Sequence, residues 1–103
     1  MSFDQKMIKD VWAKGTIPTP GRENEWRKDQ CGAWIYYQSY GDRNSNYGWE
    51  IDHITPESKG GENILSNLRP LHWRNNAGKS DGRLVTIVTS KGSENIDISK
   101  EKK

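Results

Sequence analysis

The chain has 103 residues, a net charge of +2, one cysteine and a hydrophobic fraction of 31%. This length fits one domain, and the hydrophobic fraction lies below the roughly 45–50% of average globular proteins. One cysteine excludes an internal disulfide and a zinc site made only of cysteines. No run approaches the roughly 18 apolar residues of a membrane span, and the first residues lack the apolar core of a signal peptide. We therefore expect a soluble protein, cytoplasmic by the absence of signals, with secretion as an effector by a signal-independent route left open.

Most of the apolar surface belongs to large rings, because the chain has five tryptophans and four tyrosines. Each buried ring removes on the order of 150–250 Å² from water. We expect a small aromatic core, many loops and a modest stability, to which a bound metal would add by mass action.

The first half of the chain predicts one helix and two strands. Apolar residues recur at helical spacing over residues 4–14, whereas prolines and glycines make residues 16–32 mostly loop. Aromatic and β-branched residues favour strands over residues 33–37 and 49–54. Turn-forming residues fill the gap between these strands, so we expect them to pair as a long-looped antiparallel hairpin.

The second half predicts a loop, a strand, a helix and a hairpin. Residues 55–66 are polar and contain a Gly-Gly pair, and the strand over 68–71 contains a proline typical of an edge. A short helix is expected over residues 72–80. Alternating β-branched residues at 84–89 favour another strand, which residues 95–98 pair with.

Four polar residues in the central stretch have complementary chemistry. Asp52 offers a carboxylate oxygen and Asn76 an amide oxygen, and such hard ligands suit Mg²⁺ or Mn²⁺. His53 suits a general base near neutral pH, and Asn67 can hydrogen-bond an imidazole nitrogen. A base that deprotonates water beside a metal-held phosphate describes phosphodiester hydrolysis.

Strand geometry constrains this arrangement. Asp52 and His53 are adjacent, so an ideal strand would point their side chains to opposite faces. They can serve one site only where the strand ends or twists, with the helix that bears Asn76 packed across it. The pattern therefore requires the order strand, loop, strand, helix.

These residues resemble the HNH endonuclease motif of the ββα-metal nucleases. The interval from His53 to Asn67 is fourteen residues and that from Asn67 to Asn76 is nine, similar to the HNH domain of RNA-guided CRISPR nucleases. The resemblance also includes the glycine pair at 60–61. It covers about residues 31–83 and implies a small, loop-rich α+β fold: a ββα-metal (HNH) unit with an N-terminal helix and a C-terminal β-hairpin, in a single HNH nuclease domain over residues 1–103.

The resemblance implies a role for each polar residue. Asp52 and Asn76 hold one divalent cation, Mg²⁺ or Mn²⁺, and His53 activates the attacking water. Asn67 orients His53 or the loop that carries it. The side chains expected near the phosphate backbone are Lys79, Arg74 and Arg69.

Two departures from the family pattern bear on the metal. Many relatives hold a structural zinc with two Cys-x-x-Cys pairs, but here the pairs become Cys31…Trp34 and His72…Asn75. Two possible ligands are too few for a closed site, so we expect no structural zinc and packing of Trp34 and Trp73 in its place. Relatives that bind a transition metal place a second histidine where this chain has Ser80, which favours Mg²⁺ or Mn²⁺ over Zn²⁺.

Other polar residues have simpler explanations. Glu50 shares a strand face with Asp52 and is taken as structural or solvated. His72 lies one helical turn before Asn76 and could touch the substrate or metal, but we expect it to pack. Between residues 69 and 83 the chain carries a local excess of three positive charges, which fits either a phosphate-binding patch or an ordinary solvated face. The charged residues counted are Arg69, Arg74, Lys79, Arg83 and Asp81.

We therefore expect an HNH endonuclease that hydrolyses phosphodiester bonds in DNA by a one-metal mechanism, nicking as a monomer. The alternative is a non-catalytic nucleic-acid-binding module with a decayed HNH site, which the missing zinc ligands and the small size favour. DNA versus RNA, single versus double strand, sequence preference, the physiological metal and oligomeric state stay open. So does the biological context, in which a toxin would pair with an immunity protein.

Overall fold

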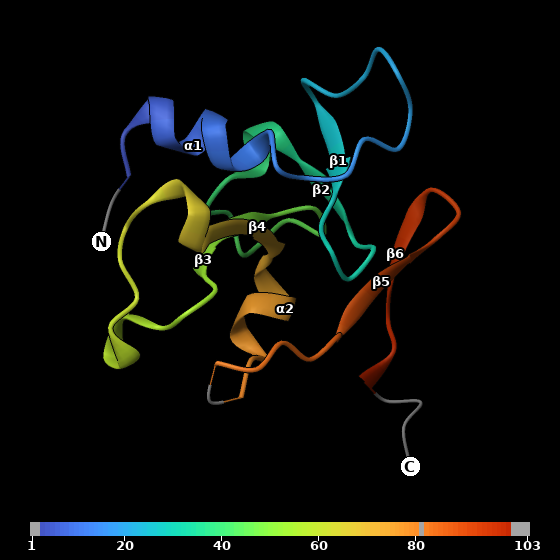
Figure 1. Ribbon diagram of the computed structural model, residues 1–103. Helices are drawn as coiled ribbons and strands as arrows, with labels where there is room; N and C mark the ends of the chain where they lie inside the picture. The colour runs from blue at the N-terminus through green and yellow to red at the C-terminus, as the bar shows by residue number, and fades with distance from the viewer. Residues whose placement is uncertain (1–2, 81, 100–103) are drawn as a thin grey trace.

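The computed structural model describes residues 3–80 and 82–99. Two short helices and three antiparallel strand pairs alternate with loops along the chain (Figure 1). The helices are α1 (Gln5–Trp12) and α2 (Trp73–Ala77). The strands are β1 (Trp26–Lys28), β2 (Trp34–Tyr36), β3 (Trp49–His53), β4 (Leu68–His72), β5 (Val88–Lys91) and β6 (Glu94–Asp97). The expected small α+β fold is confirmed.

Helix α1 forms where the apolar spacing predicts it. The Asp4 carboxylate accepts a hydrogen bond from the backbone N–H of Met7 at 2.9 Å, which caps the first turn. The helix buries Val11 and Trp12 against the rest of the molecule. In Figure 1 it lies across the β3–β4 pair, on the side opposite α2.

The core is small and built around rings, as the composition predicts. The buried cluster consists of Val11, Trp12, Ile35, Trp49, Ile51 and Leu68. The ring centroids of Trp12 and Trp49 are 5.1 Å apart, and the Trp12 indole N–H donates to the Glu23 carbonyl at 2.9 Å. Strand β3 therefore turns its odd-numbered residues towards α1 and its even-numbered residues away.

The pairing of the first strands differs from the prediction. Strand β2 pairs with β1, and β3 pairs with β4, so the expected hairpin between residues 33–37 and 49–54 is wrong. Strand β1 lies in the segment expected to be loop. Its Arg27 is buried and donates to the carbonyls of Ala13 and Gly15, a long-range anchor that local proline and glycine signals do not report.

The β3–β4–α2 unit has the expected order of strand, loop, strand and helix. The register places Asp52 opposite Arg69 and His53 opposite Leu68. Helix α2 begins directly after β4 and is shorter than the helix expected over residues 72–80. Whether this unit surrounds a metal, as in the ββα-metal nucleases, stays a prediction.

The C-terminal hairpin, β5–β6, is confirmed with a shift of its first strand from residues 84–89 to 88–91. The segment before β5 is held by α2, because the Asn75 side-chain oxygen accepts the backbone N–H groups of Ile87 and Val88 at 2.8 Å each.

Among the described residues, no helix is both long enough and apolar enough to cross a membrane.

Candidate nuclease site

Asp52 lies near the end of β3 and is held by two cations. Its side chain is only 4% exposed. Arg69, its cross-strand neighbour, donates from Nε to Oδ2 at 2.7 Å, and the Lys79 ammonium contacts Oδ1. Lys79 also donates to the His53 carbonyl at 3.1 Å, so it joins the chain beyond α2 to the last two residues of β3.

Asn76, three residues before Lys79, also contacts an acidic side chain of β3. Its side-chain N–H donates to Glu50 Oε1 at 2.7 Å, and Arg43 binds the same carboxylate through two hydrogen bonds of 2.6 and 2.8 Å. Burial raises the pKa of Glu50, but the hydrogen bonds from Arg43 and Asn76 outweigh it, so the pKa lies below its ordinary value. Glu50 is therefore an ionised carboxylate that fixes the Asn76 amide.

The two predicted metal ligands, Asp52 and Asn76, thus lie at the interface between β3 and the segment that starts with α2. Asp52 contacts Arg69 and Lys79, whereas Asn76 contacts Glu50. Glu50 and Asp52 project from the same face of β3. Asn76 of α2 contacts Glu50, and Lys79, just after α2, contacts Asp52. The contact with Glu50 uses the Asn76 nitrogen and leaves its oxygen for another partner. Glu50 was expected to be structural or solvated, yet it orients a proposed ligand. Glu50 is two residues before Asp52 on β3, and this spacing was the sequence signal that both side chains share one face.

His53 has a separate set of neighbours. Its Nε2 lies 2.5 Å from the Asn63 side-chain oxygen, and its ring centroid is 6.2 Å from that of Phe3. With Nε2 donating to Asn63, Nδ1 is the nitrogen that can accept a proton. Asp52 binds Arg69 and Lys79 instead, and Lys79 also reaches the His53 carbonyl at the point where β3 ends. Asn63 has no spacing signal in the sequence, which is why it was missed.

Asn67 holds the loop rather than the histidine ring. Its side-chain oxygen accepts the Thr55 N–H at 2.8 Å, and its nitrogen donates to the carbonyls of Thr55 and Glu62 at 3.1 and 3.0 Å. The Asn67 carbonyl also accepts the Ile54 N–H at 2.8 Å. Of the two roles considered, orienting His53 or orienting the loop that carries it, these contacts favour the loop.

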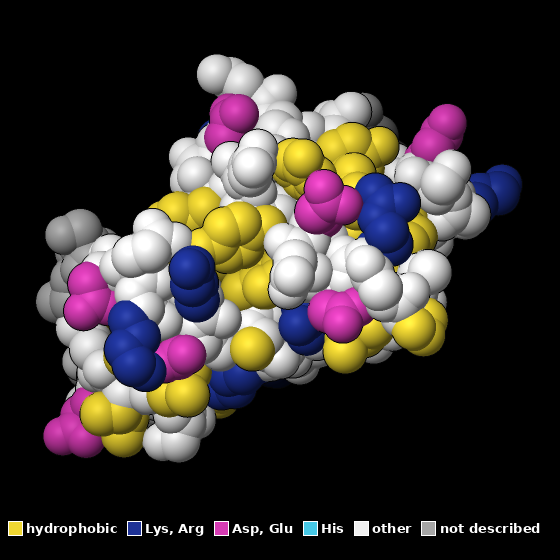
Figure 2. Space-filling view, turned by 90° about the horizontal axis from the view of Figure 1, so that it is seen from above, with side chains coloured by type: hydrophobic (Ala, Val, Ile, Leu, Met, Phe, Trp, Pro, Cys, Tyr) yellow, Lys and Arg dark blue, Asp and Glu magenta, His cyan; other side chains and the backbone are white. Residues whose placement is uncertain are grey.

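The cations expected near phosphate already have anionic partners. Arg69 and Lys79 contact Asp52, and the Arg74 guanidinium contacts Asp97 on β6. Arg83 is exposed, and Asp81 lies outside the described residues. On the face seen in Figure 2, lysines and arginines stand beside acidic and hydrophobic side chains rather than in one basic area.

A buried hydrogen-bond network joins the two segments in which the family pattern would place zinc ligands, around Cys31 and His72. The Asp29 carboxylate, 2% exposed, accepts the backbone N–H groups of Cys31, Ala33 and His72. It also accepts the Asn75 side-chain N–H at 3.0 Å, and Asn75 donates to the Val88 carbonyl at the same distance. This network links the loop after β1, the end of β4, α2 and β5.

The network corrects the expected role of two tryptophans. Trp34 packs against Trp26, and Trp73 stacks on His72 with centroids 5.8 Å apart, while the link between the two segments is made by Asp29 and Asn75. Asp29 precedes Cys31 by two residues and matches no family position, so the motif did not reveal it. The expected absence of a structural zinc stays a prediction, which this network supports.

His72 packs as expected. It is 1% exposed, its Nε2 donates to the Asn46 carbonyl at 2.8 Å, and its Nδ1 accepts the Arg74 N–H at 3.1 Å. Burial lowers the pKa of His72 below its ordinary value. These bonds leave neither nitrogen for a metal.

Comparison with known proteins identifies the central segment. The family model described as HNH endonuclease matches residues 39–82. The resemblance deduced from the motif is therefore confirmed over this segment, which contains β3, β4 and α2. The match suggests nuclease activity in general terms; nucleases of this family act on nucleic acids and generally use a divalent metal. Searches of curated proteins and of solved structures each found no match.

Proposed function

We propose that the protein is a metal-dependent endonuclease that hydrolyses phosphodiester bonds in DNA and nicks one strand at a time. The observation that carries this proposal is the Asp52-His53 pair at the end of β3, beside a helix that presents Asn76, within the matched segment. Asp52, His53 and Asn76 are all present, which argues against a decayed site. One site in each chain accounts for nicking rather than double-strand cleavage.

The donor groups at this interface fit Mg²⁺ or Mn²⁺. Asp52 provides carboxylate oxygens, and the Asn76 oxygen is left available by the hydrogen bond from its nitrogen to Glu50. Such hard oxygens are the ligands these cations prefer, with water and phosphate completing the shell. Within residues 3–80 and 82–99, no group of three histidine, cysteine or acidic residues is placed to hold a metal, so the proposed set depends on the amide.

The His53 imidazole would act on the attacking water. Its Nδ1 accepts a proton as the water oxygen forms a bond to phosphorus and the bond from phosphorus to the 3′ oxygen breaks. Asn63 keeps the opposite nitrogen protonated, and Asn67 fixes the loop behind it. A bound cation would stabilise the negative charge on the phosphate and the leaving oxygen. The products would carry 5′-phosphate ends.

The test is conversion of supercoiled plasmid to open circle. Purified protein is incubated with Mg²⁺, Mn²⁺, Zn²⁺ or chelator, and we expect open circle with Mg²⁺ or Mn²⁺ and none with chelator. Linear product at low enzyme would contradict nicking by a monomer. Tight plasmid binding without cleavage in any metal would contradict the enzyme and support the binding module.

Removing Lys79 is expected to strengthen cation binding. Its ammonium contacts the Asp52 oxygen that a metal would use, so Lys79→Ala removes a competitor and leaves Arg69 in place. We expect about tenfold tighter binding of Mn²⁺, a change of roughly 1.4 kcal/mol. Titration calorimetry without nucleic acid measures it.

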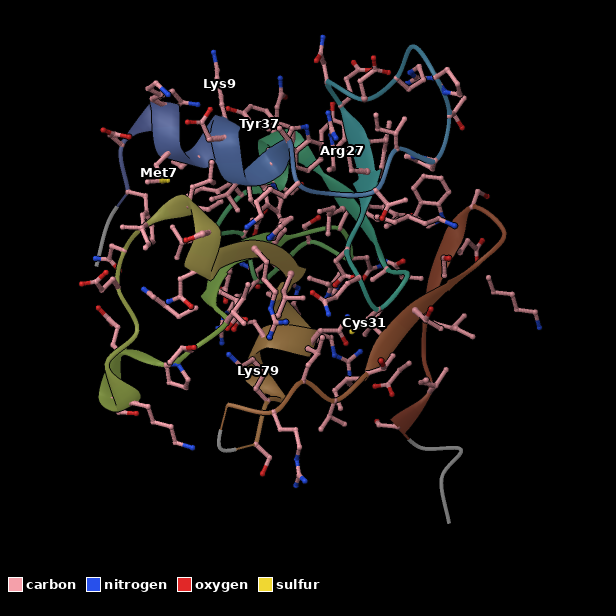
Figure 3. The ribbon with its side chains drawn as sticks, viewed as in Figure 1. Met7, Lys9, Arg27, Cys31, Tyr37 and Lys79 are labelled. Atoms are coloured by element: carbon pink, nitrogen blue, oxygen red, sulfur yellow. The ribbon has the colours of Figure 1, made fainter. Side chains whose placement is uncertain are left out.

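Lys9 provides the matched control for this titration. It is exposed on α1, far from Lys79 (Figure 3), so Lys9→Ala should bind Mn²⁺ as the parent does. If Lys79→Ala binds Mn²⁺ no more tightly than Lys9→Ala, the cation does not take the place of the ammonium.

A further inference from the structure

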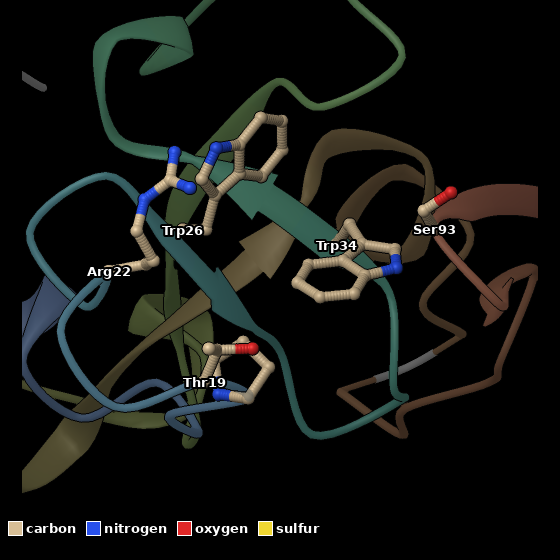
Figure 4. A pocket seen from close by; sticks show the side chains of 6 residues that line it. Thr19, Arg22, Trp26, Trp34 and Ser93 are labelled. Carbon is tan, nitrogen blue, oxygen red and sulfur yellow. The ribbon is translucent and has the colours of Figure 1, made fainter.

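A second concave site lies away from the nuclease residues, between the loop after α1 and the first strand pair. The Trp pocket, as we call it, has a volume of about 200 Å³. Figure 4 shows Arg22 and Trp26 on one side of it and Trp34 with Ser93 on the other. Its lining residues are Pro18, Thr19, Arg22, Trp26, Trp34 and Ser93.

The two tryptophans of the pocket are held rigidly. The Trp34 indole N–H donates to the Gly92 carbonyl at 2.8 Å, and Asn95 binds both its backbone N–H and its carbonyl. Trp26 lies 4.7 Å from the Tyr36 ring and perpendicular to Trp34 at 6.0 Å. Because these rings are already ordered, a ligand would bind without the entropic cost of arranging them.

The dimensions and chemistry suit one flat ring system. Pockets for drug-sized ligands span roughly 300–1,000 Å³, so this smaller volume fits a single base rather than a larger molecule. Tryptophan faces stack on any nucleobase, because every base has a π-face. Arg22 at the rim is exposed and shares only a surface ion pair with Glu25, which leaves it able to meet a phosphate.

A second hollow, the basic hollow, shares no lining residue with the Trp pocket and reaches the proposed nuclease site. It has a volume of about 160 Å³, and its lining includes three cations, Lys14, Lys28 and Arg69, one carboxylate, Asp29, and the apolar Ile54. At one end, Arg69 binds Asp52 and Ile54 follows His53 in the chain. At the other end, the Lys28 ammonium lies 4.7 Å from the Trp34 ring centroid. Lys28 therefore lines the basic hollow and contacts Trp34, which lines the Trp pocket.

We propose that the Trp pocket holds one unpaired nucleobase of the substrate, whose phosphate backbone follows the basic hollow to Asp52 and His53. This inference rests on the proposed nuclease function and names its substrate as a strand with at least one base out of the duplex. The lining of the hollow carries three cations against one carboxylate, and this excess of positive charge complements a polyanion better than an apolar peptide. Stacking on tryptophan then distinguishes a nucleic acid from other polyanions.

Binding in chelator tests the pocket without cleavage. Fluorescence anisotropy compares a labelled single-stranded oligonucleotide with the same strand carrying abasic positions. We expect the intact strand to bind about 5- to 150-fold more tightly, the range that stacking of one base provides. Thr19→Phe fills the pocket from an exposed position and should bring this ratio close to one, as should Trp34→Leu.

Trp73→Leu is the matched control, because Trp73 is a half-buried tryptophan outside the pocket, and its ratio should equal that of the parent. Equal affinity of the parent for intact and abasic strands would overturn the proposal, and so would an unchanged ratio in folded Thr19→Phe. Plasmid nicking by the parent with metal is read separately. Nicking without base preference rejects only the pocket, whereas absence of both nicking and binding rejects the nuclease as well.

Discussion

Replacement of His53 by alanine is expected to slow metal-dependent nicking of plasmid by about 10²- to 10⁴-fold, the usual contribution of a general base. The variant should remain folded, because the ring is only half-buried and contacts Asn63 and Phe3 at the edge of the core. Initial rates on supercoiled plasmid measure the loss, and circular dichroism checks the fold.

Two further variants distinguish the role of His53 as general base from the role of Asn63, which binds its ring. Asn63→Ala should lose less activity than His53→Ala, since it removes only the hydrogen bond to Nε2. His53→Gly should regain activity when imidazole is added, which a merely structural role would not produce. If His53→Ala nicks plasmid as fast as the parent, either another group is the base or the activity comes from a contaminant.

Asp29→Ala is expected to cost about 4 kcal/mol of unfolding free energy. Four donors converge on this carboxylate, and each buried donor left without an acceptor costs roughly 1–3 kcal/mol. The individual costs overlap because the donors share one site. Since small domains have only about 5–15 kcal/mol in total, this is a large fraction. Urea denaturation monitored by tryptophan fluorescence measures it.

Asp42→Ala is the matched comparison, because the side chain of this exposed aspartate accepts one described hydrogen bond, from the Asn44 N–H at 2.9 Å. It should cost no more than about 1 kcal/mol. Asn75→Ala should cost about as much as Asp29→Ala, since it leaves the N–H groups of Ile87 and Val88 without their acceptor. Equal stability of Asp29→Ala and Asp42→Ala would show that the network is not what joins these segments.

The motif segment was predictable because its signals are local. Strand β3 follows from Trp49 and Ile51, whose alternation also sets the face of Asp52, and β4 follows from the short segment with Pro70 that precedes the helix. The order strand, loop, strand, helix could therefore be deduced without knowing which strands pair. The pairing of β2 with β1 could not be predicted, because the contacts that hold Trp26 and Arg27 are distant in sequence: Trp26 pairs with Tyr36, and Arg27 donates to the Ala13 carbonyl after α1.

The contacts of the site were hidden for a related reason. The partners of Asp52, namely Arg69 and Lys79, are seventeen and twenty-seven residues away. Spacing predicts which face a residue occupies but not which hydrogen bond its side chain makes there. Glu50 was placed on the correct face, yet its bond to Asn76 depends on how α2 packs across the strand.

The two cations on Asp52 have a consequence for the protein when divalent metal is scarce. A buried carboxylate with no partner would cost several kcal/mol, but Arg69 and Lys79 belong to the chain and balance its charge when no metal is bound. Under the proposed metal-dependent mechanism, a cell that sequesters its divalent cations should therefore silence the protein without unfolding it. A folded chain escapes the proteases that remove unfolded ones, so activity would return with the cation and require no new synthesis.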